Sequence, residues 1–166
     1  SEAVCASNFY GAPHKRFRLI GVTGTNGKTT VTYLLKHILE HMGKKVGLIG
    51  TNQNMIGDEV FETGRTTPDS IELQGIFEKM AKAEVDYCIM EVSSHALELE
   101  RVYGCNFYCG AFTNLTQDHL DFHKTMDNYA KAKSKLFSVC DNAIINADDP
   151  YSPVMMLEAK GKIYSY

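Results

Sequence analysis

A glycine-rich stretch near the start of the chain has the composition and spacing of a phosphate-binding loop. Residues 19–30 read LIGVTGTNGKTT, in which an apolar segment ends at Val22. Gly21, Gly24 and Gly27 should let the backbone turn, with positive φ, where side chains would clash. Such a loop can direct several backbone N–H groups at one anion, and the amino end of the following helix adds its dipole.

Two side chains at the end of this stretch add chemistry to the loop. Lys28 supplies a full positive charge, and Thr29 supplies a hydroxyl suited to a phosphate-bound Mg²⁺. The form is G-x-x-G-x-x-G-K-T, because Val22 stands where the strict P-loop has glycine. A plain glycine-rich turn before a helix would not need the lysine and threonine in this order. The predicted phosphate-binding residues are Gly24, Thr25, Asn26, Gly27, Lys28, Thr29 and Thr30.

Glu91 is the second candidate, at the end of an apolar run, 85–92, that is typical of a buried parallel strand. Ligands of open α/β sheets bind beyond the carboxyl ends of the strands, so Glu91 should share an edge with the phosphate loop. A carboxylate there can hold Mg²⁺; the alternative is a strand-end glutamate in solvent. Ser93 and His95 follow directly, and His95 is equally compatible with ligand contact and with packing behind the site.

Lys133 falls on the inward side of a helix that we expect over residues 125–139. At about 100° per residue, it shares a stripe with apolar residues such as Tyr129, whereas Lys131 and Lys135 point away. An inward lysine is costly unless it is paired or chemically altered. Alternatively, its stem lies along apolar surface and its ammonium reaches water. The spacing leaves these alternatives open.

Two histidines, His119 and His123, lie in a polar loop before this helix in H-x-x-x-H spacing. Such a pair can hold zinc on one helix face, but the glutamate of H-E-x-x-H is missing and the region starts as a loop. We therefore do not expect a zinc site.

A pair of threonines, Thr66 and Thr67, precedes Pro68. Proline suits the first position of a helix, and Thr67 is then the expected cap. Capping uses one threonine and leaves the other hydroxyl free for a ligand, but the spacing alone does not favour this functional role over a structural one.

Bulk properties narrow the classes of function. The chain has 166 residues, 44% of them hydrophobic, and a net charge of −3, which indicates a globular domain without a nucleic-acid footprint. No apolar run approaches the ~20 residues of a membrane span. Five cysteines without C-x-x-C spacing indicate buried free thiols in a reducing cytoplasm.

Strand and helix patterns alternate along the chain, which predicts an α/β fold with a mostly parallel, doubly wound sheet. We expect strands over 18–22, 44–50, 85–92, 109–113, 142–146 and 162–166, helices over 29–42, 68–83, 125–139 and 151–159, and a hairpin near 57–58. The residues of the first helix expected to pack on the sheet are Val31, Leu34, Leu35, Ile38 and Met42.

Six motifs in chain order resemble the Mur ligase family of ATP-dependent amino-acid ligases. They are Gly21–Thr30, Thr66–Pro68, Glu91–Leu97, Asn114–His123, Tyr129–Lys133 and Asn146–Pro150. The Glu-Val-Ser-Ser-His run separates the chain from folylpolyglutamate synthetases, which share the Thr-Asn-Gly-Lys loop. The resemblance implies that residues 18–166 are the central ATP-binding domain, truncated at its C-terminal end. Residues 1–17 would be a linker from a missing N-terminal domain.

The resemblance also implies catalytic roles for four residues. Lys28 would contact the transferring phosphate, and Glu91 would hold one Mg²⁺ together with Thr29. His119 would hold a second Mg²⁺. Lys133 falls where the family has a carbamylated lysine, whose carboxylate reaches the second metal through water.

Other matching positions imply contacts to the substrates. Those implied for the acceptor are Thr66, Thr67, Ser93 and Arg101. Asn146 and Asp148 would lie near the adenine. Leu99 stands where some relatives have glutamine, so that contact is not carried over.

The implied activity belongs to peptidoglycan synthesis, and so to cell-wall biogenesis, cell shape and cell division. The γ-carboxylate of UDP-N-acetylmuramoyl-L-alanyl-D-glutamate attacks ATP, and the resulting acyl phosphate is coupled to a diamino acid, meso-diaminopimelate or L-lysine. We expect a cytoplasmic monomer without nucleic-acid or membrane partners, and no ligation by this fragment alone. The alternatives are a nucleotide-binding module without ligase activity, and a ligase of the cyanophycin or folylpolyglutamate type.

Overall fold

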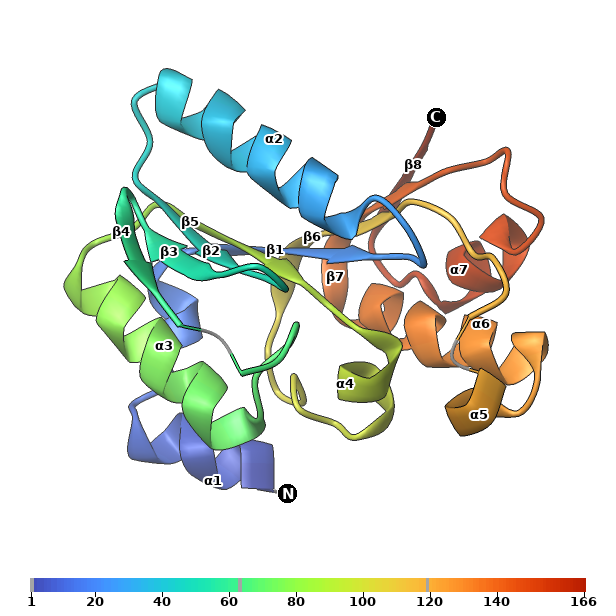
Figure 1. The fold of residues 1–166 in the computed structure, drawn as a ribbon, viewed down its shortest axis with the longest axis horizontal. Helices are drawn as coiled ribbons and strands as arrows, with labels where there is room; N and C mark the ends of the chain where they lie inside the picture. Colours follow the sequence, from blue (N-terminus) through green and yellow to red (C-terminus); the bar gives the residue numbers. More distant parts are fainter. Residues whose placement is uncertain (1, 63, 119) are drawn as a thin grey trace.

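A computed structural model describes residues 2–62, 64–118 and 120–166. Its centre is an eight-stranded sheet in the order β4-β3-β2-β5-β1-β6-β7-β8 (Figure 1). The strands are β1 Arg18–Thr23, β2 Val46–Ile49, β3 Asn54–Ile56, β4 Glu59–Phe61, β5 Tyr87–Glu91, β6 Phe107–Phe112, β7 Cys140–Ile145 and β8 Lys162–Ser165. Neighbours from β2 to β8 pair in parallel, and β3 and β4 form an antiparallel hairpin at one edge.

Helices cover both faces of this sheet. They are α1 Glu2–Phe9, α2 Lys28–His41, α3 Ser70–Lys82, α4 Ser94–Glu98, α5 Leu120–His123, α6 Met126–Ser134 and α7 Ser152–Glu158, with 3₁₀ turns η1 Pro13–Arg16 and η2 Lys135–Val139. Figure 1 shows α2 on one face and α3, α4 and α6 on the other. The predicted doubly wound α/β fold is confirmed, and so is the hairpin, which turns at Gly57 with φ of 57°.

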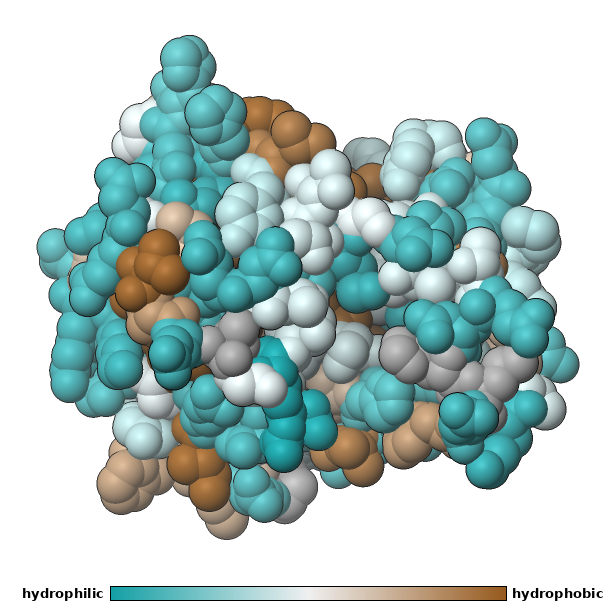
Figure 2. All heavy atoms as spheres, viewed as in Figure 1, coloured by the Kyte–Doolittle hydropathy of each residue, from teal (hydrophilic) through white to brown (hydrophobic). Residues whose placement is uncertain are grey.

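The packing face predicted for α2 is partly wrong. Val31 and Leu35 pack against the sheet as expected. Leu34, Ile38 and Met42 are instead more than half exposed. Figure 2 shows this apolar surface over the middle of α2. The helical spacing identified an apolar stripe, but the contact with the sheet is centred to one side of that stripe.

A helix precedes the first strand, and α3 begins at a cap other than the one predicted. Residues 1–17, which the resemblance implies are a linker, contain α1, which packs on α3. The cap of α3 is Asp69, whose side chain accepts from the backbone N–H of Glu72, so the cap predicted at Thr67 is wrong. Thr67 uses its hydroxyl elsewhere, as shown below.

Four of the five cysteines are buried and all five are free thiols. Burial raises the pKa of the Cys105 thiol to about 12, so this group is an inert, neutral part of the core at physiological pH. The prediction of buried free thiols is confirmed for all except Cys5, which is exposed. Among the described residues, no helix combines the length and apolar character needed to cross a membrane.

Candidate active site

The glycine-rich loop turns between β1 and α2 at the carboxyl edge of the sheet. Gly24 and Gly27 have φ of 146° and 87°, which confirms the positive φ predicted there. A Cβ on Gly24 would overlap the hydroxyl of Thr113, which follows β6. That hydroxyl donates to the carbonyl of Asn26 at 2.7 Å, and the N–H of Asn26 donates to Asn114 Oδ1 at 3.0 Å. The loop is therefore braced from β6.

Gly21 serves a different purpose from the one predicted. It lies within β1 rather than in a turn. A Cβ there would come within 2.8 Å of the Phe107 ring, so this glycine permits close packing beneath the loop.

Lys28 begins α2 and folds back over the loop. Its Nζ donates to the carbonyls of Gly24 at 2.8 Å and Thr25 at 2.9 Å. Burial lowers the pKa of Lys28, and the charges of Glu91 and Asp118 oppose that shift. Charged phosphate oxygens are stronger acceptors than carbonyls, so this ammonium is poised to exchange them for a phosphate.

Glu91, at the end of β5, is only 1% exposed. Its Oε1 accepts from the Thr29 hydroxyl at 2.9 Å and from the N–H of Thr51 at 3.0 Å, and its Oε2 accepts from the Thr51 hydroxyl at 2.9 Å. A carboxylate beside a hydroxyl is the kind of oxygen ligand set that Mg²⁺ prefers, so the residues present fit this ion. Thr51 was missed at the sequence level.

The four residues predicted to contact the acceptor lie close to Glu91 or to residues bonded to it. Thr67 is fully buried, and its hydroxyl donates to the carbonyl of Glu91 at 2.9 Å. It also accepts from the N–H of Ser93 at 3.0 Å, and Arg101 donates to the carbonyl of Thr67 at 3.0 Å. Thr66 and Ser93 line a cavity that also includes Glu91 and the glycine-rich loop, whereas Thr67 and Arg101 are not among its lining residues.

Lys133 is 1% exposed, which confirms the prediction of an inward lysine and excludes an ammonium that reaches water. Its Nζ donates to the carbonyl of Gly24 at 2.9 Å, the same carbonyl that Lys28 contacts. Burial, and secondarily the Lys28 charge, lower the pKa of Lys133 to about 7. The structure therefore brings Lys133 to the phosphate loop as an amine that is substantially neutral near physiological pH.

This lowered pKa predicts a pH-dependent stability. Between pH ~7 and ~10 the unfolded chain binds a proton at Lys133 that the folded chain does not, so folding stability should rise with pH. The slope approaches about 1.4 kcal/mol per pH unit within that window. Lys133→Met should remove this rise. Denaturant unfolding of both proteins at pH 7, 8 and 9 measures it, and equal slopes for the two proteins would show that Lys133 does not titrate there.

An aromatic stack behind Lys133 was also missed. The Tyr129 ring lies 4.6 Å from Lys133 Nζ, and its hydroxyl is 3.2 Å from Thr25 Oγ1 in the loop. The ring of buried His123 stacks on Tyr129 at 4.9 Å. His95 packs nearby, with its ring centre 5.6 Å from that of His123, which supports the packing interpretation of His95. The position of Tyr129, one turn before Lys133, was the available signal.

Two further predictions concern the ends of the site. His119 lies outside the described residues. Asn146 follows β7 and donates from Nδ2 to the carbonyl of Thr113 at 2.8 Å, while its Oδ1 accepts from the N–H of Asp148 at 3.1 Å. These two residues therefore adjoin the brace of the phosphate loop, and their contact with adenine stays a prediction.

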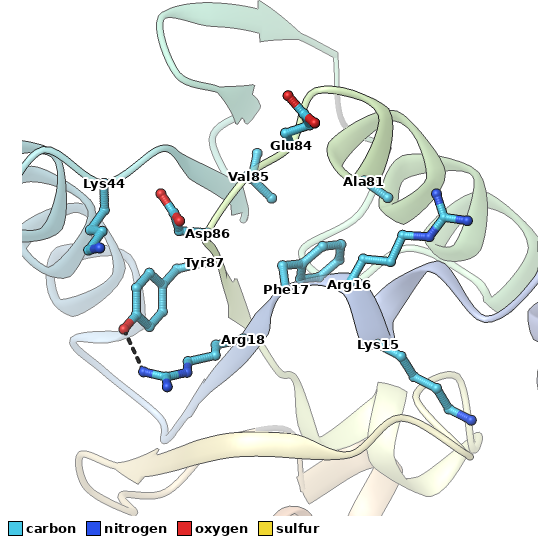
Figure 3. A pocket seen from close by; sticks show the side chains of 10 residues that line it. All are labelled: Lys15, Arg16, Phe17, Arg18, Lys44, Ala81, Glu84, Val85, Asp86 and Tyr87. Carbon is cyan, nitrogen blue, oxygen red and sulfur yellow. Dashed lines mark hydrogen bonds between the residues drawn. The ribbon is translucent and has the colours of Figure 1, made fainter.

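The cavity lined by the predicted site residues is smaller than another cavity of the same domain. A hollow of about 800 Å³ lies at the amino edge of the sheet, where Arg18 opens β1 and Tyr87 opens β5 (Figure 3). The Arg18 guanidinium donates to the Tyr87 hydroxyl at 3.0 Å. The cavity of about 290 Å³ at the carboxyl edge instead joins the phosphate loop to Glu91, Thr66 and Ser93. The chemistry predicted from the sequence converges on this smaller cavity.

Sequence comparison places the chain in a known class of proteins. The Mur ligase middle domain matches residues 22–166, and the chain belongs to the Mur ligase family.

Two similar proteins carry the same name. The chain is 56% identical over 165 residues to the UDP-N-acetylmuramoyl-L-alanyl-D-glutamate–2,6-diaminopimelate ligase of Caldanaerobacter subterraneus subsp. tengcongensis, covering 99% of this chain and 34% of the relative. It is 47% identical over 175 residues to the Bacillus cereus ligase of that name, covering 100% of this chain and 36% of the relative. The chain thus spans about a third of the length of these relatives.

Solved structures show the same architecture. A structure of a UDP-N-acetylmuramoyl-L-alanyl-D-glutamate–2,6-diaminopimelate ligase superposes with a TM-score of 0.82 and 36% identity, over 90% of this chain and 32% of that one. The folylpolyglutamate synthase of Mycobacterium tuberculosis, solved with ADP and AMPPCP, superposes with a TM-score of 0.79 at 15% identity, over 98% and 46%. The second likeness is one of fold.

Proposed function

We propose that this chain is the nucleotide-binding part of an ATP-dependent ligase of peptidoglycan synthesis. The acceptor is UDP-N-acetylmuramoyl-L-alanyl-D-glutamate and the incoming amino acid is diaminopimelate. One observation carries the proposal: a single cavity joins the phosphate loop to Glu91, Thr66 and Ser93. Relatives at 47% and 56% identity that are named for these substrates support the choice.

The proposed reaction has two steps. The D-glutamyl γ-carboxylate attacks the γ-phosphorus of ATP, and the bond from this phosphorus to the bridging oxygen breaks. ADP departs, and the acceptor becomes an acyl phosphate. The amine of diaminopimelate then attacks the acyl carbon, and phosphate and a proton leave as the amide forms. The loop amides orient the triphosphate, Lys28 neutralises its charge, and Thr66 and Ser93 orient the acceptor. Thr29 and Glu91 would hold Mg²⁺, which would supply positive charge where two anions meet.

Carbamylation of Lys133 is part of the proposal. An amine with a pKa of about 7 is largely neutral at slightly alkaline pH and can attack CO₂. A bond forms between Nζ and the carbon, one proton leaves the nitrogen, and the neutral amine becomes a carbamate that carries a carboxylate. His119 and this carboxylate would hold a second Mg²⁺.

We also propose a cytoplasmic monomer that uses no nucleic-acid or membrane partner.

Two alternative functions fit the site less well. A nucleotide-binding module without ligase activity would not need a buried lysine against the loop carbonyl of Gly24. The folylpolyglutamate type is disfavoured because those structures share 15–18% identity with the chain, against 36% for the diaminopimelate ligase structure and 47–56% for the two relatives. The relatives named above are 2,6-diaminopimelate ligases, which favours diaminopimelate over L-lysine.

A chimera tests this function. The chain would replace the matching third of the Caldanaerobacter relative, with which it shares 56% identity. Phosphate release should require both the UDP-muramoyl dipeptide and diaminopimelate, and L-lysine or a folate with glutamate should not substitute. The chain alone should bind ATP without forming amide. Phosphate release that ignores the dipeptide, or amide formed by the chain alone, would contradict the proposal.

A further inference from the structure

We propose that Gly50 and Thr51, directly after β2, position Glu91 for binding of the Mg²⁺–nucleotide complex. Thr51 is in this sense a positioning residue, and Gly50 leaves room for the Glu91 carboxylate that Thr51 holds. The inference rests on the proposed metal role of Glu91 and adds to it a residue that orients the metal-binding carboxylate.

Thr51 holds both oxygens of one carboxylate. Its N–H lies 3.0 Å from Glu91 Oε1, and its hydroxyl lies 2.9 Å from Oε2. The third bond to this carboxylate comes from Thr29, which is itself a candidate metal ligand. Two donors on different oxygens fix the plane of the carboxylate, because rotation would break both bonds. Once Thr29 turns toward a metal, Thr51 is the residue that keeps Glu91 in place.

Gly50 is needed here for space. A Cβ at this position would come within 2.6 Å of Glu91 Oε1. Its φ lies outside the left-handed region, so an alanine can adopt the same backbone. The atom in the way is the tip of a flexible side chain. An alanine would therefore displace the carboxylate of Glu91 and leave β2 intact.

The Thr51 hydroxyl also reaches the acceptor side of the cavity. It lies 3.0 Å from the Thr66 hydroxyl, which lines that cavity. A hydroxyl has one proton, and a carboxylate only accepts. The Thr51 proton therefore points to Glu91, and the Thr66 proton points to Thr51. This chain of two hydroxyls links the metal-binding carboxylate to the loop predicted to contact the acceptor.

Calorimetric titration of this chain with ATP, with Mg²⁺ or with EDTA, tests the inference. Glu91→Gln should abolish the gain in affinity that Mg²⁺ gives. Thr51→Val and Gly50→Ala should weaken ATP binding about tenfold with Mg²⁺ and less than about twofold with EDTA. A tenfold loss of affinity corresponds to the free energy of one hydrogen bond to a charged group. Thr51→Ser, which keeps the hydroxyl, should restore most of the Mg²⁺ gain. Ser138→Ala, which removes a hydroxyl on η2 far along the chain from the loop, is the matched control.

Two failures can be told apart. If Glu91→Gln loses the Mg²⁺ gain while Thr51→Val and Gly50→Ala keep it, the positioning role is wrong and the proposed function stands. If Glu91→Gln keeps the Mg²⁺ gain, the metal role of Glu91 fails and this inference fails with it. Equal losses with Mg²⁺ and with EDTA would mean that the variants disturb the loop generally, and would also overturn the positioning role. Because Gly50→Ala and Thr51→Val perturb the carboxylate from different atoms, agreement between them excludes a folding defect of one variant.

Discussion

Lys28→Met is expected to weaken ATP binding by this chain at least about a hundredfold, or ~2.7 kcal/mol. Methionine keeps the unbranched stem but removes the charge that faces the phosphates. The ammonium now bonds to the carbonyls of Gly24 and Thr25, which are weaker acceptors than phosphate oxygens. Titration calorimetry against ATP with Mg²⁺ measures the loss.

The same change should leave the fold almost as stable as before. Burial lowers the pKa of Lys28, so holding the ammonium there already costs free energy. A neutral side chain of similar length should shift the free energy of unfolding by no more than about 1 kcal/mol. Lys131→Met, at an exposed position on α6, is the matched control and should change neither quantity. ATP affinity retained within fivefold in Lys28→Met would show that this loop does not bind the triphosphate.

Lys133→Ala is expected to lower ligation by the chimera at least about a thousandfold. The variant removes the group that the proposal turns into a metal-binding carboxylate, and such charge stabilisation commonly supplies several kcal/mol in phosphoryl transfer. Binding of ATP should fall much less, because Lys28 and the loop amides remain. Steady-state release of phosphate, compared with calorimetric ATP affinity, separates the two effects.

Rescue distinguishes a carboxylate from an amine at this position. A small carboxylic acid, added to Lys133→Ala, can occupy the space that the side chain leaves and should restore part of the rate. Lys133→Arg keeps a positive charge but cannot form the carbamate, so it should be as inactive as the alanine variant. Lys131→Ala, on the exposed side of the same helix, should ligate normally. An active Lys133→Arg enzyme would refute the carbamate.

The parts of the site that local pattern specifies were predictable. The order of strand, glycine turn and helix around Lys28 was predicted without knowledge of the rest of the chain, and the structure has this order. Glu91 ends an apolar run, and the carboxyl ends of parallel strands meet at one edge. The inward position of Lys133 followed from helical spacing, because Tyr129 and Lys133 are four residues apart and face the same side.

The face of α2 was not predictable in the same way. Spacing finds the apolar stripe but not which neighbour covers it. In the structure Lys36 is 6% exposed and bonds to Glu40 at 2.7 Å, while Leu34 and Ile38 are half exposed. Because the contact with the sheet is displaced to one side of the stripe, Lys36 is buried and Leu34 and Ile38 are exposed. Only the assembled fold shows this displacement.

Contacts between distant residues account for the remaining misses. Thr51 and Glu91 lie 40 positions apart, and no local pattern marks a threonine after β2 as the partner of an acid at the end of β5. The cap of α3 was misplaced for a related reason. The Thr67 hydroxyl donates to the carbonyl of Glu91, and Asp69 caps the helix instead. Both unpredicted contacts, those of Thr51 and Thr67, are made to Glu91.

The central claim is that the glycine loop, Glu91 and Lys133 form one metal-dependent site for ATP. The most direct measurement is a crystal structure of this chain with a non-hydrolysable ATP analogue, Mn²⁺ and bicarbonate, with anomalous scattering to locate the metal. The account predicts phosphates on the loop, Mn²⁺ bonded to Thr29 and Glu91, and a carboxylate on Lys133 Nζ. A nucleotide bound elsewhere, or Mn²⁺ that contacts neither Glu91 nor an altered Lys133, would contradict it.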